Sequence, residues 1–279
     1  HNDIKGTGRN GRLKRSDVLS YLEDNNSNKQ DLPNTSSRVD EFDDKTIIPF
    51  NHRRKMTAEH MVRSKATSPH VLQAVEIDFS KVEKARYELG PDWKKREGYS
   101  LTYLPFIARA LCSAIKDFPK LNGHVEEDKL VVFDRVNLAV AIDLDFEGLV
   151  APIIKDADLK GVTEIARAIN ELAIRARAEK LTADDYLNAT YTVSNNGSFG
   201  TLITAPIINQ PQVAILSTDG VSKRATVIEK DGEDLIAIRP IGILAQSFDH
   251  RAIDGSYSGA FMRRLKEILE TRNWAEIVS

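Results

Sequence analysis

The chain has 279 residues, 41% hydrophobic and 29% charged, so it can bury a sizeable core and is neither disordered nor collagen-like. Its 39 lysines and arginines nearly balance 41 aspartates and glutamates, which leaves a net charge of −2 and excludes nucleic acid or an acidic membrane surface as the main partner. The single cysteine, Cys112, cannot form an internal disulfide or a thiolate cluster for zinc, and no apolar run reaches the roughly 20 residues that span a bilayer.

Residues 1–24 are glycine-rich and basic, and they predict a small folding unit. Three early glycines form a turn-rich loop, after which Ser16 begins a short helical pattern. The positive charge of this unit comes from Lys5, Arg9, Arg12, Lys14 and Arg15. It indicates either docking onto an acidic partner or a solvated basic arm. Residues 25–45 are polar and lack apolar periodicity, so they predict a flexible linker to a larger domain at residues 46–279.

Three stretches of the larger domain carry apolar residues at the spacing of an amphipathic helix. These stretches are Leu104–Ile115, Val162–Ala176 and Tyr257–Leu269. Cys112 lies on the apolar face of the first stretch. We therefore expect it to be a small core residue rather than a reactive thiol.

Short apolar runs between turn signals predict strands. The runs are 130–133, 137–143, 149–154, 190–194, 213–217, 226–228 and 235–238. Asp231-Gly232 between the last two runs is a hairpin signal, and Glu147-Gly148 separates two earlier runs in the same way. Strands joined locally favour antiparallel pairing, and the three helices can cover one face of such a sheet. The patterns therefore predict an α/β fold, a two-layer sandwich.

His250, in the segment SFDHRAIDGSYSG, is the one histidine of six with acidic companions in a tight motif. It follows the apolar run 241–245, Asp254 comes four residues later, and Gly255 permits a sharp turn before the last helix. A strand end that turns into a helix is a common place for functional side chains. An unperturbed imidazole, with a pKa of about 6.5, is a competent base at neutral pH. The spacing alone leaves catalysis, metal binding and a structural hydrogen bond as alternatives.

A second candidate, Ser194, ends a predicted strand in TVSNNGSFG, just before the Asn196-Gly197 turn. Its hydroxyl can donate a hydrogen bond to a substrate, although serines in turns commonly bond to nearby backbone groups instead. A Ser194–His250–Asp254 hydrolase triad is disfavoured, because the serine lacks a G-x-S-x-G elbow and the chain order matches no familiar triad. A metal site is also disfavoured, because no second histidine at helical spacing and no thiolate accompanies His250.

Five motifs of the main domain form a recognisable set. They are RRKMTAEHMVRS (53–64), GLVAPIIKDAD (148–158), TVSNNGSFG (192–200), PIINQPQVAIL (206–216) and SFDHRAIDG (247–255). In composition and order they resemble the catalytic domain of the dihydrolipoamide acyltransferases, the core of 2-oxo acid dehydrogenase complexes. Residues 6–22 resemble the second half of that family's peripheral-subunit-binding domain, and 25–45 its linker. Because the chain begins with His1 and lacks that domain's first helix and the lipoyl domain, we expect it to be part of a longer polypeptide.

The resemblance implies a fold of the chloramphenicol acetyltransferase type, with a mixed sheet, and an acyl transfer between dihydrolipoamide and coenzyme A that needs no metal. The family's motif histidine falls on His250, which would act as general base on the thiol. Its oxyanion-binding hydroxyl falls on Ser194, and Asp254 would hold the loop through a salt bridge to an arginine. The resemblance further implies trimers in which His250 and Ser194 of one site come from different subunits, and a larger core built from these trimers.

The same resemblance implies that the basic unit at 1–24 binds a 2-oxo acid decarboxylase and a dihydrolipoamide dehydrogenase. The lipoyl group would be carried on a domain absent from this chain, and the location would be cytoplasmic in a prokaryote or the mitochondrial matrix in a eukaryote. An alternative function is a non-catalytic core paralogue that only scaffolds the partners. Intact His250, Asp254 and Ser194 favour the enzyme. The motifs resemble branched-chain and succinyl members somewhat more than acetyl members, which leaves the acyl group open.

Overall fold

A computed structural model describes Arg15 and residues 45–278 of the chain. A compact unit spans Phe50–Ser279, and the predicted larger domain begins nearby, at residue 46. Apart from Arg15 and Lys45, the residues of the predicted basic unit and of the linker lie outside the described part. Every helix among the described residues is too short or too polar to cross a bilayer.

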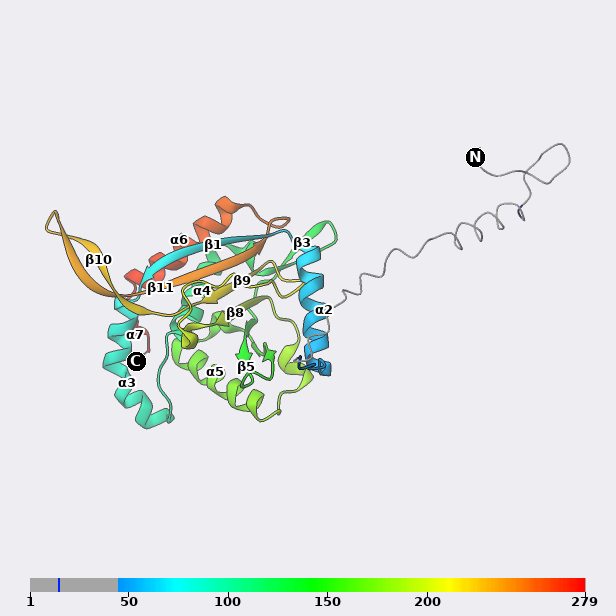
Figure 1. The fold of residues 1–279 in the computed structure, drawn as a ribbon. Coiled ribbons are helices and arrows are strands. Elements are labelled where there is room, and N and C mark those ends of the chain that lie inside the picture. The colour runs from blue at the N-terminus through cyan, green and yellow to red at the C-terminus, as the bar shows by residue number, and fades with distance from the viewer. Residues whose placement is uncertain (1–14, 16–44, 279) are drawn as a thin grey trace, which may run out of the picture. The chain divides into compact units, whose positions relative to one another are not determined.

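Helices and strands of the compact unit are labelled in Figure 1. The helices are α2 (His52–Thr67), α3 (Ser80–Glu97), α4 (Leu104–Asp117), α5 (Val162–Arg177), α6 (Gly255–Thr271) and α7 (Trp274–Val278). The strands are β1 (His70–Asp78), β2 (Gly123–Glu126), β3 (Lys129–Val132), β4 (Leu138–Val140), β5 (Ile142–Asp143), β6 (Leu149–Val150), β7 (Ile153–Ile154), β8 (Tyr191–Asn195), β9 (Ala214–Thr218), β10 (Ser222–Lys230) and β11 (Glu233–Asp249). The three predicted amphipathic helices are confirmed as α4, α5 and α6.

Seven strands form one mixed sheet in the order β1-β11-β9-β8-β4-β7, with β10 paired to β11 outside this path. β1, β9 and β10 run antiparallel to β11, and β7 runs antiparallel to β4. β8 pairs in parallel with both β4 and β9. Both predicted hairpins are present, between β10 and β11 and between β5 and β6. Asp231 and Gly232, at φ of 56° and 83°, both adopt the left-handed backbone that a type I′ turn requires.

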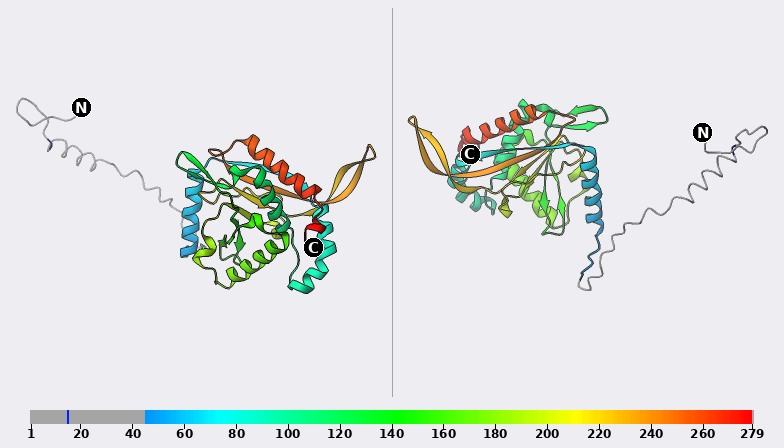
Figure 2. Two further views of the ribbon diagram at one scale, coloured as in Figure 1. Left: turned by 180° about the vertical axis from the view of Figure 1, so that it is seen from behind. Right: turned by 45° about the horizontal axis from the view of Figure 1, so that its top comes forward.

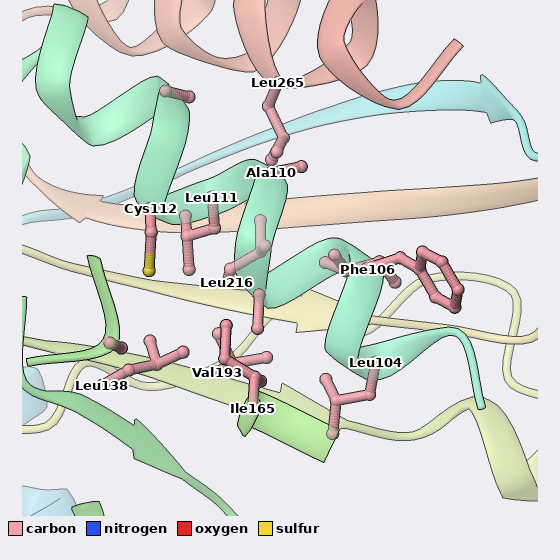
Figure 3. Packing of buried hydrophobic residues seen from close by; sticks show 14 of the residues in the cluster. Leu104, Phe106, Ala110, Leu111, Cys112, Leu138, Ile165, Val193, Leu216 and Leu265 are labelled. Carbon is pink, nitrogen blue, oxygen red and sulfur yellow. The ribbon is translucent and has the colours of Figure 1, made fainter. Parts of the chain in front are cut away.

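The hydrophobic core lies between one face of the sheet and the helices α4, α5 and α6 (Figures 2 and 3). Ten of the fourteen residues of α4 are buried, so this helix is the centre of the core. Figure 3 shows its side chains facing Leu138, Val193 and Leu216 of the sheet. Cys112 is fully buried here, and burial raises the pKa of its thiol to about 12, which confirms a core residue. Helices on one face of a mixed sheet make the predicted two-layer α/β sandwich.

β10 and the first half of β11 form a two-stranded ribbon that projects from the body (Figures 1 and 2). β11 then enters the sheet between β1 and β9. Gly242 lies at this crossing, and a Cβ atom there would come within 2.9 Å of both Phe79 and Val221 side chains. A glycine is therefore required where the long strand passes from the ribbon into the body.

Five helices and strands of the main domain were not among the predicted ones: α2, α3, α7, β1 and β2. α2 buries only Ser64, so its sequence carries no apolar stripe for periodicity to detect. α3 contains Gly90 and Pro91, both of which favour a break rather than a helix. β1 pairs with β11, and its first residue, His70, pairs with Asp249 at the end of β11.

Candidate active site

His250 lies where β11 ends and the chain turns toward α6. Two backbone hydrogen bonds fix this turn, because Asp249 N donates to Val213 O at 2.8 Å and His250 N donates to Pro69 O at 3.1 Å. Asp254 then serves as the N-cap residue of α6, with extended backbone angles. The apolar end of β11 and the start of the last helix therefore place His250 in a short, well-anchored loop.

The imidazole of His250 is accessible and makes no hydrogen bond with the described residues. Its side chain is 44% exposed, and Nδ1 lies 3.8 Å from Asp254 Oδ1, which is longer than a hydrogen bond. The ring also lies beside that of Phe248. Asp254 is itself 83% exposed and has no arginine partner within the described chain. The arginine of this loop, Arg251, pairs with Asp249 instead, so the described residues do not form the salt bridge that was expected for Asp254.

Asp249, the residue before His250, is fully buried and anchors the loop from below. Its carboxylate accepts hydrogen bonds from the Arg251 guanidinium and from the hydroxyl of Ser68, and Gln210 Nε2 donates to that same hydroxyl at 2.6 Å. Burial alone would raise the pKa of Asp249, but the bonds from Arg251 and Ser68 outweigh it and hold the pKa below its usual value. Sequence reasoning missed this network, because Ser68 and Gln210 are far from the motif along the chain.

Ser194 is the fourth residue of β8 and is half-buried. Within the strand it lies on the same face as Thr192, opposite the face of Tyr191 and Val193 that packs in the core. Its hydroxyl makes no hydrogen bond with any residue in the described part of the chain. The alternative of a serine bonded to nearby backbone groups is therefore not what the structure contains.

The loop that follows Ser194 is held by a buried carboxylate, Asp219, which is 4% exposed. Thr201 and Thr204 donate hydroxyl hydrogen bonds to Asp219 at 2.5 and 2.7 Å, and Ser217 donates a longer one at 3.3 Å. Ser217 is also the register partner of Ser194 on β9. These bonds fix the end of the strand that presents Ser194.

Ser194 and His250 do not meet within one chain. Ser194 pairs with Ser217, which pairs with Ala245, so Ser194 is two strands away from Ala245. His250 lies five residues beyond Ala245, just past the end of β11. At about 4.8 Å per strand and about 3.3 Å per residue, the two Cα atoms are roughly 19 Å apart. Within a single chain the two side chains are therefore too far apart to contact the same substrate atom.

The sequence matches a known family over most of its length. A sequence model of the family described as 2-oxoacid dehydrogenases acyltransferase (catalytic domain) matches residues 42–278. The lipoamide acyltransferase component of the branched-chain alpha-keto acid dehydrogenase complex of Bacillus subtilis is 34% identical over 96% of this chain and 66% of that protein. The dihydrolipoyllysine-residue succinyltransferase component of the 2-oxoglutarate dehydrogenase complex of Rickettsia felis is also 34% identical, over 96% of this chain and 65% of that protein. The chain thus spans slightly less than two thirds of these relatives.

Solved structures of the same family share the fold. A probable dihydrolipoamide acetyltransferase from Listeria monocytogenes is 39% identical with a TM-score of 0.77, over 83% of this chain and 98% of that chain. The dihydrolipoamide acetyltransferase of Azotobacter vinelandii is 29% identical with a TM-score of 0.76, over 81% of this chain and 92% of that chain. A serine, a histidine and an asparagine of that enzyme were investigated for their role in catalysis, the last two spaced as His250 and Asp254 are. The chain therefore belongs to the family of 2-oxoacid dehydrogenase acyltransferases, as its catalytic domain.

Proposed function

We propose that this chain transfers an acyl group between dihydrolipoamide and coenzyme A, with His250 as general base and Ser194 as the hydrogen-bond donor to the oxyanion. One observation carries the proposal. The imidazole and the hydroxyl are both accessible and both without a hydrogen-bond partner in the described chain, although buried polar neighbours hold each of them in place. Polar groups kept free by their surroundings are typical of sites that bind a substrate.

The reaction exchanges one thioester for another. A free thiol has a pKa of about 8.5 and is mostly protonated at neutral pH, so His250 takes its proton as the sulfur attacks the thioester carbonyl carbon. A carbon–sulfur bond forms, and Ser194 donates a hydrogen bond to the resulting oxyanion. When this intermediate collapses, the original carbon–sulfur bond breaks and the departing thiolate takes the proton back. Asp254, 3.8 Å from Nδ1, stabilises the transient imidazolium.

The two groups act together only if a second copy of the chain completes the site, because they are roughly 19 Å apart within one copy. A cyclic trimer would place His250 of one subunit against Ser194 of the next and so form three equivalent sites. Exposed apolar side chains on the projecting ribbon support self-association: Val227, Ile236 and Ile238 are 64%, 81% and 73% exposed. In the whole protein, a lipoyl domain would deliver the acyl group, and decarboxylase and dehydrogenase components would be the partners.

Acyl transfer from acyl-CoA to free dihydrolipoamide tests the proposal. We expect His250→Ala to lower kcat by about 10²- to 10⁴-fold and Ser194→Ala by about a hundredfold. His52→Ala, which removes an exposed histidine at the start of α2, is the control and should retain full activity. A fully active His250→Ala variant would end the general-base assignment. A wild type without transfer would favour the non-catalytic scaffold, and a comparison of acetyl-, isobutyryl- and succinyl-CoA identifies the acyl group.

A further inference from the structure

A backbone hydrogen bond ties His250 to a segment that is far from it in the sequence. Its imidazole makes no hydrogen bond with the described residues, whereas its backbone N–H donates to Pro69 O at 3.1 Å. Pro69 lies between the end of α2 at Thr67 and the start of β1 at His70. The position of the proposed catalytic base therefore depends on how the turn at residues 68–70 is held.

His70, the residue after Pro69, holds this turn with both nitrogens of its ring. Nδ1 lies 2.8 Å from Ser68 O, and because a carbonyl oxygen only accepts, Nδ1 carries the proton. Nε2 accepts a hydrogen bond from the backbone N–H of Ile208 at 3.0 Å. Only a neutral ring with its proton on Nδ1 makes both bonds. The two bonds therefore fix both the tautomer and the orientation of the His70 ring.

Ile208 is itself held in place, so His70 is bonded to a fixed segment. The side chain of Ile208 is fully buried, and its carbonyl oxygen accepts a hydrogen bond from the Ser64 hydroxyl at 2.6 Å. Ser64 is 1% exposed and is the residue that α2 buries. The ring of His70 thus joins the turn before β1 to the segment that α2 contacts.

Ser68, on the other side of Pro69, is anchored by its side chain. Its hydroxyl donates a hydrogen bond to the buried Asp249 at 2.5 Å. Asp249 is also the register partner of His70 in the pairing of β1 with β11. The Pro69 carbonyl is therefore flanked by an anchored residue on each side.

A histidine suits this place because it must donate at one atom and accept at another. Among the side chains, only a neutral imidazole carries a donor and an acceptor at two separate atoms of one rigid ring. A phenylalanine ring fills a similar space and makes neither bond. A glutamine amide retains one donor group and one acceptor, but on a flexible chain. These two side chains provide a graded loss of the same contacts.

We propose that His70 is a positioning residue for the catalytic base. Its neutral ring holds the Pro69 carbonyl, and through it the backbone of His250, in the place from which the imidazole reaches the substrate thiol. The inference rests on the proposed function and adds a second histidine, which acts on the loop and not on the substrate. Removal of His70 should therefore affect catalysis only while His250 is present.

Transfer from acyl-CoA to dihydrolipoamide measures the effect on the base. His70→Phe should lower kcat about 10- to 100-fold and leave KM unchanged, because a displacement of about 1 Å in a reacting group can cost about a hundredfold in rate. His70→Gln should recover part of this loss. His60→Phe, the same exchange at an exposed histidine of α2, is the control and should change neither constant. An unchanged kcat in a folded His70→Phe variant would overturn the inference.

A double-mutant cycle separates positioning from a general structural role. In the His250→Ala background the base is absent, so the addition of His70→Phe should leave the residual rate unchanged. If it lowered that rate by the same factor as in the wild type, His70 would act independently of the base and the inference would be wrong. Failure of both His70→Phe and His70→Gln to fold would also overturn it, because His70 would then support the whole domain and not this turn.

Amide hydrogen exchange tests the inference apart from the proposed function. In His70→Phe, the backbone amide of His250 should exchange about tenfold faster, the effect of one weakened hydrogen bond, while the amides of α5 exchange as in the wild type. If the wild type showed no transfer, the proposed function would be wrong, and the exchange rate would still decide whether His70 holds the loop. Unchanged exchange at His250 would contradict the inference.

Discussion

Mixing two inactive variants tests whether the active site is shared between subunits. His250→Ala removes the base and keeps Ser194, whereas Ser194→Ala removes the donor and keeps the base. Both residues must lie within hydrogen-bond distance, about 3 Å, of the reacting atoms of one substrate. Because about 19 Å separates their positions within one chain, they cannot both contact the same substrate there. If each site takes one residue from each of two neighbours, the intact residues of the two variants can meet in a mixed trimer.

The expected recovery follows from the symmetry of a ring. In trimers assembled at random from equal amounts of both variants, half of the subunits supply His250 and half of their neighbours supply Ser194. About one quarter of the sites therefore regain both groups. We expect kcat per subunit to recover to about a quarter of the wild-type value, with KM unchanged, because each restored site is complete.

The assay needs mixed trimers of known composition. Coexpression of the two variants with different affinity tags, followed by purification on both tags in succession, isolates trimers that contain both subunits. Selection of this kind removes pure trimers, so the recovered fraction should rise somewhat above a quarter, to about a third. Mixing either variant with the double variant His250→Ala/Ser194→Ala should restore nothing. If doubly purified trimers were no more active than the separate variants, the site would lie within single subunits and the reasoning from the sheet register would be refuted.

Two further substitutions test the buried groups beneath the site. Tyr191→Phe should lower the free energy of unfolding by about 1–3 kcal/mol in urea titrations, because Gln246 Oε1 would lose its buried donor, while Tyr87→Phe, at 86% exposure, should change nothing. Asp249→Asn should cost about 1–3 kcal/mol at pH 7, a modest value because its Arg251 partner is 37% exposed and solvent-screened. Since the folded-state pKa of Asp249 is lowered, its contribution is complete above the unfolded value of about 3.9 and is lost as pH falls through the folded pKa. The difference in the free energy of unfolding between the wild type and Asp249→Asn should therefore be smaller at pH 3 than at pH 7. An equal difference at both pH values would contradict the lowered pKa.

The elements that sequence patterns predicted are those with one sharply apolar face. α4, α5 and α6 repeat apolar residues at helical spacing because each packs against the sheet, and the pattern records that packing. α2 has almost no buried side chain in the single chain, so nothing in its pattern marks it as a helix. Its burial would depend on contacts outside the chain, which intrachain periodicity does not encode.

The candidate site likewise contains residues that the sequence reveals and residues that it does not. His250, Asp254 and Gly255 lie within six residues, so their motif can be recognised from the sequence alone. Ser68 and Gln210, which hold the loop, are joined to it only by the pairing of β1 with β11 and by the path of the 196–212 segment. Contacts of this kind cannot be predicted from neighbouring residues in the sequence, because a polar residue at either position looks like an ordinary loop residue.

The separation of His250 from Ser194 gives a physical reason for coupling assembly to activity. Each group is held by buried bonds of its own chain, Asp249 beneath the histidine and Asp219 beneath the loop after the serine, so each is positioned before any partner arrives. Neither group is satisfied by its own chain, however, and neither has its catalytic complement within reach. Positioning would then be a property of the subunit, whereas catalysis would be a property of the interface. A substitution that weakens association without touching either residue should consequently abolish transfer while leaving each half-site folded.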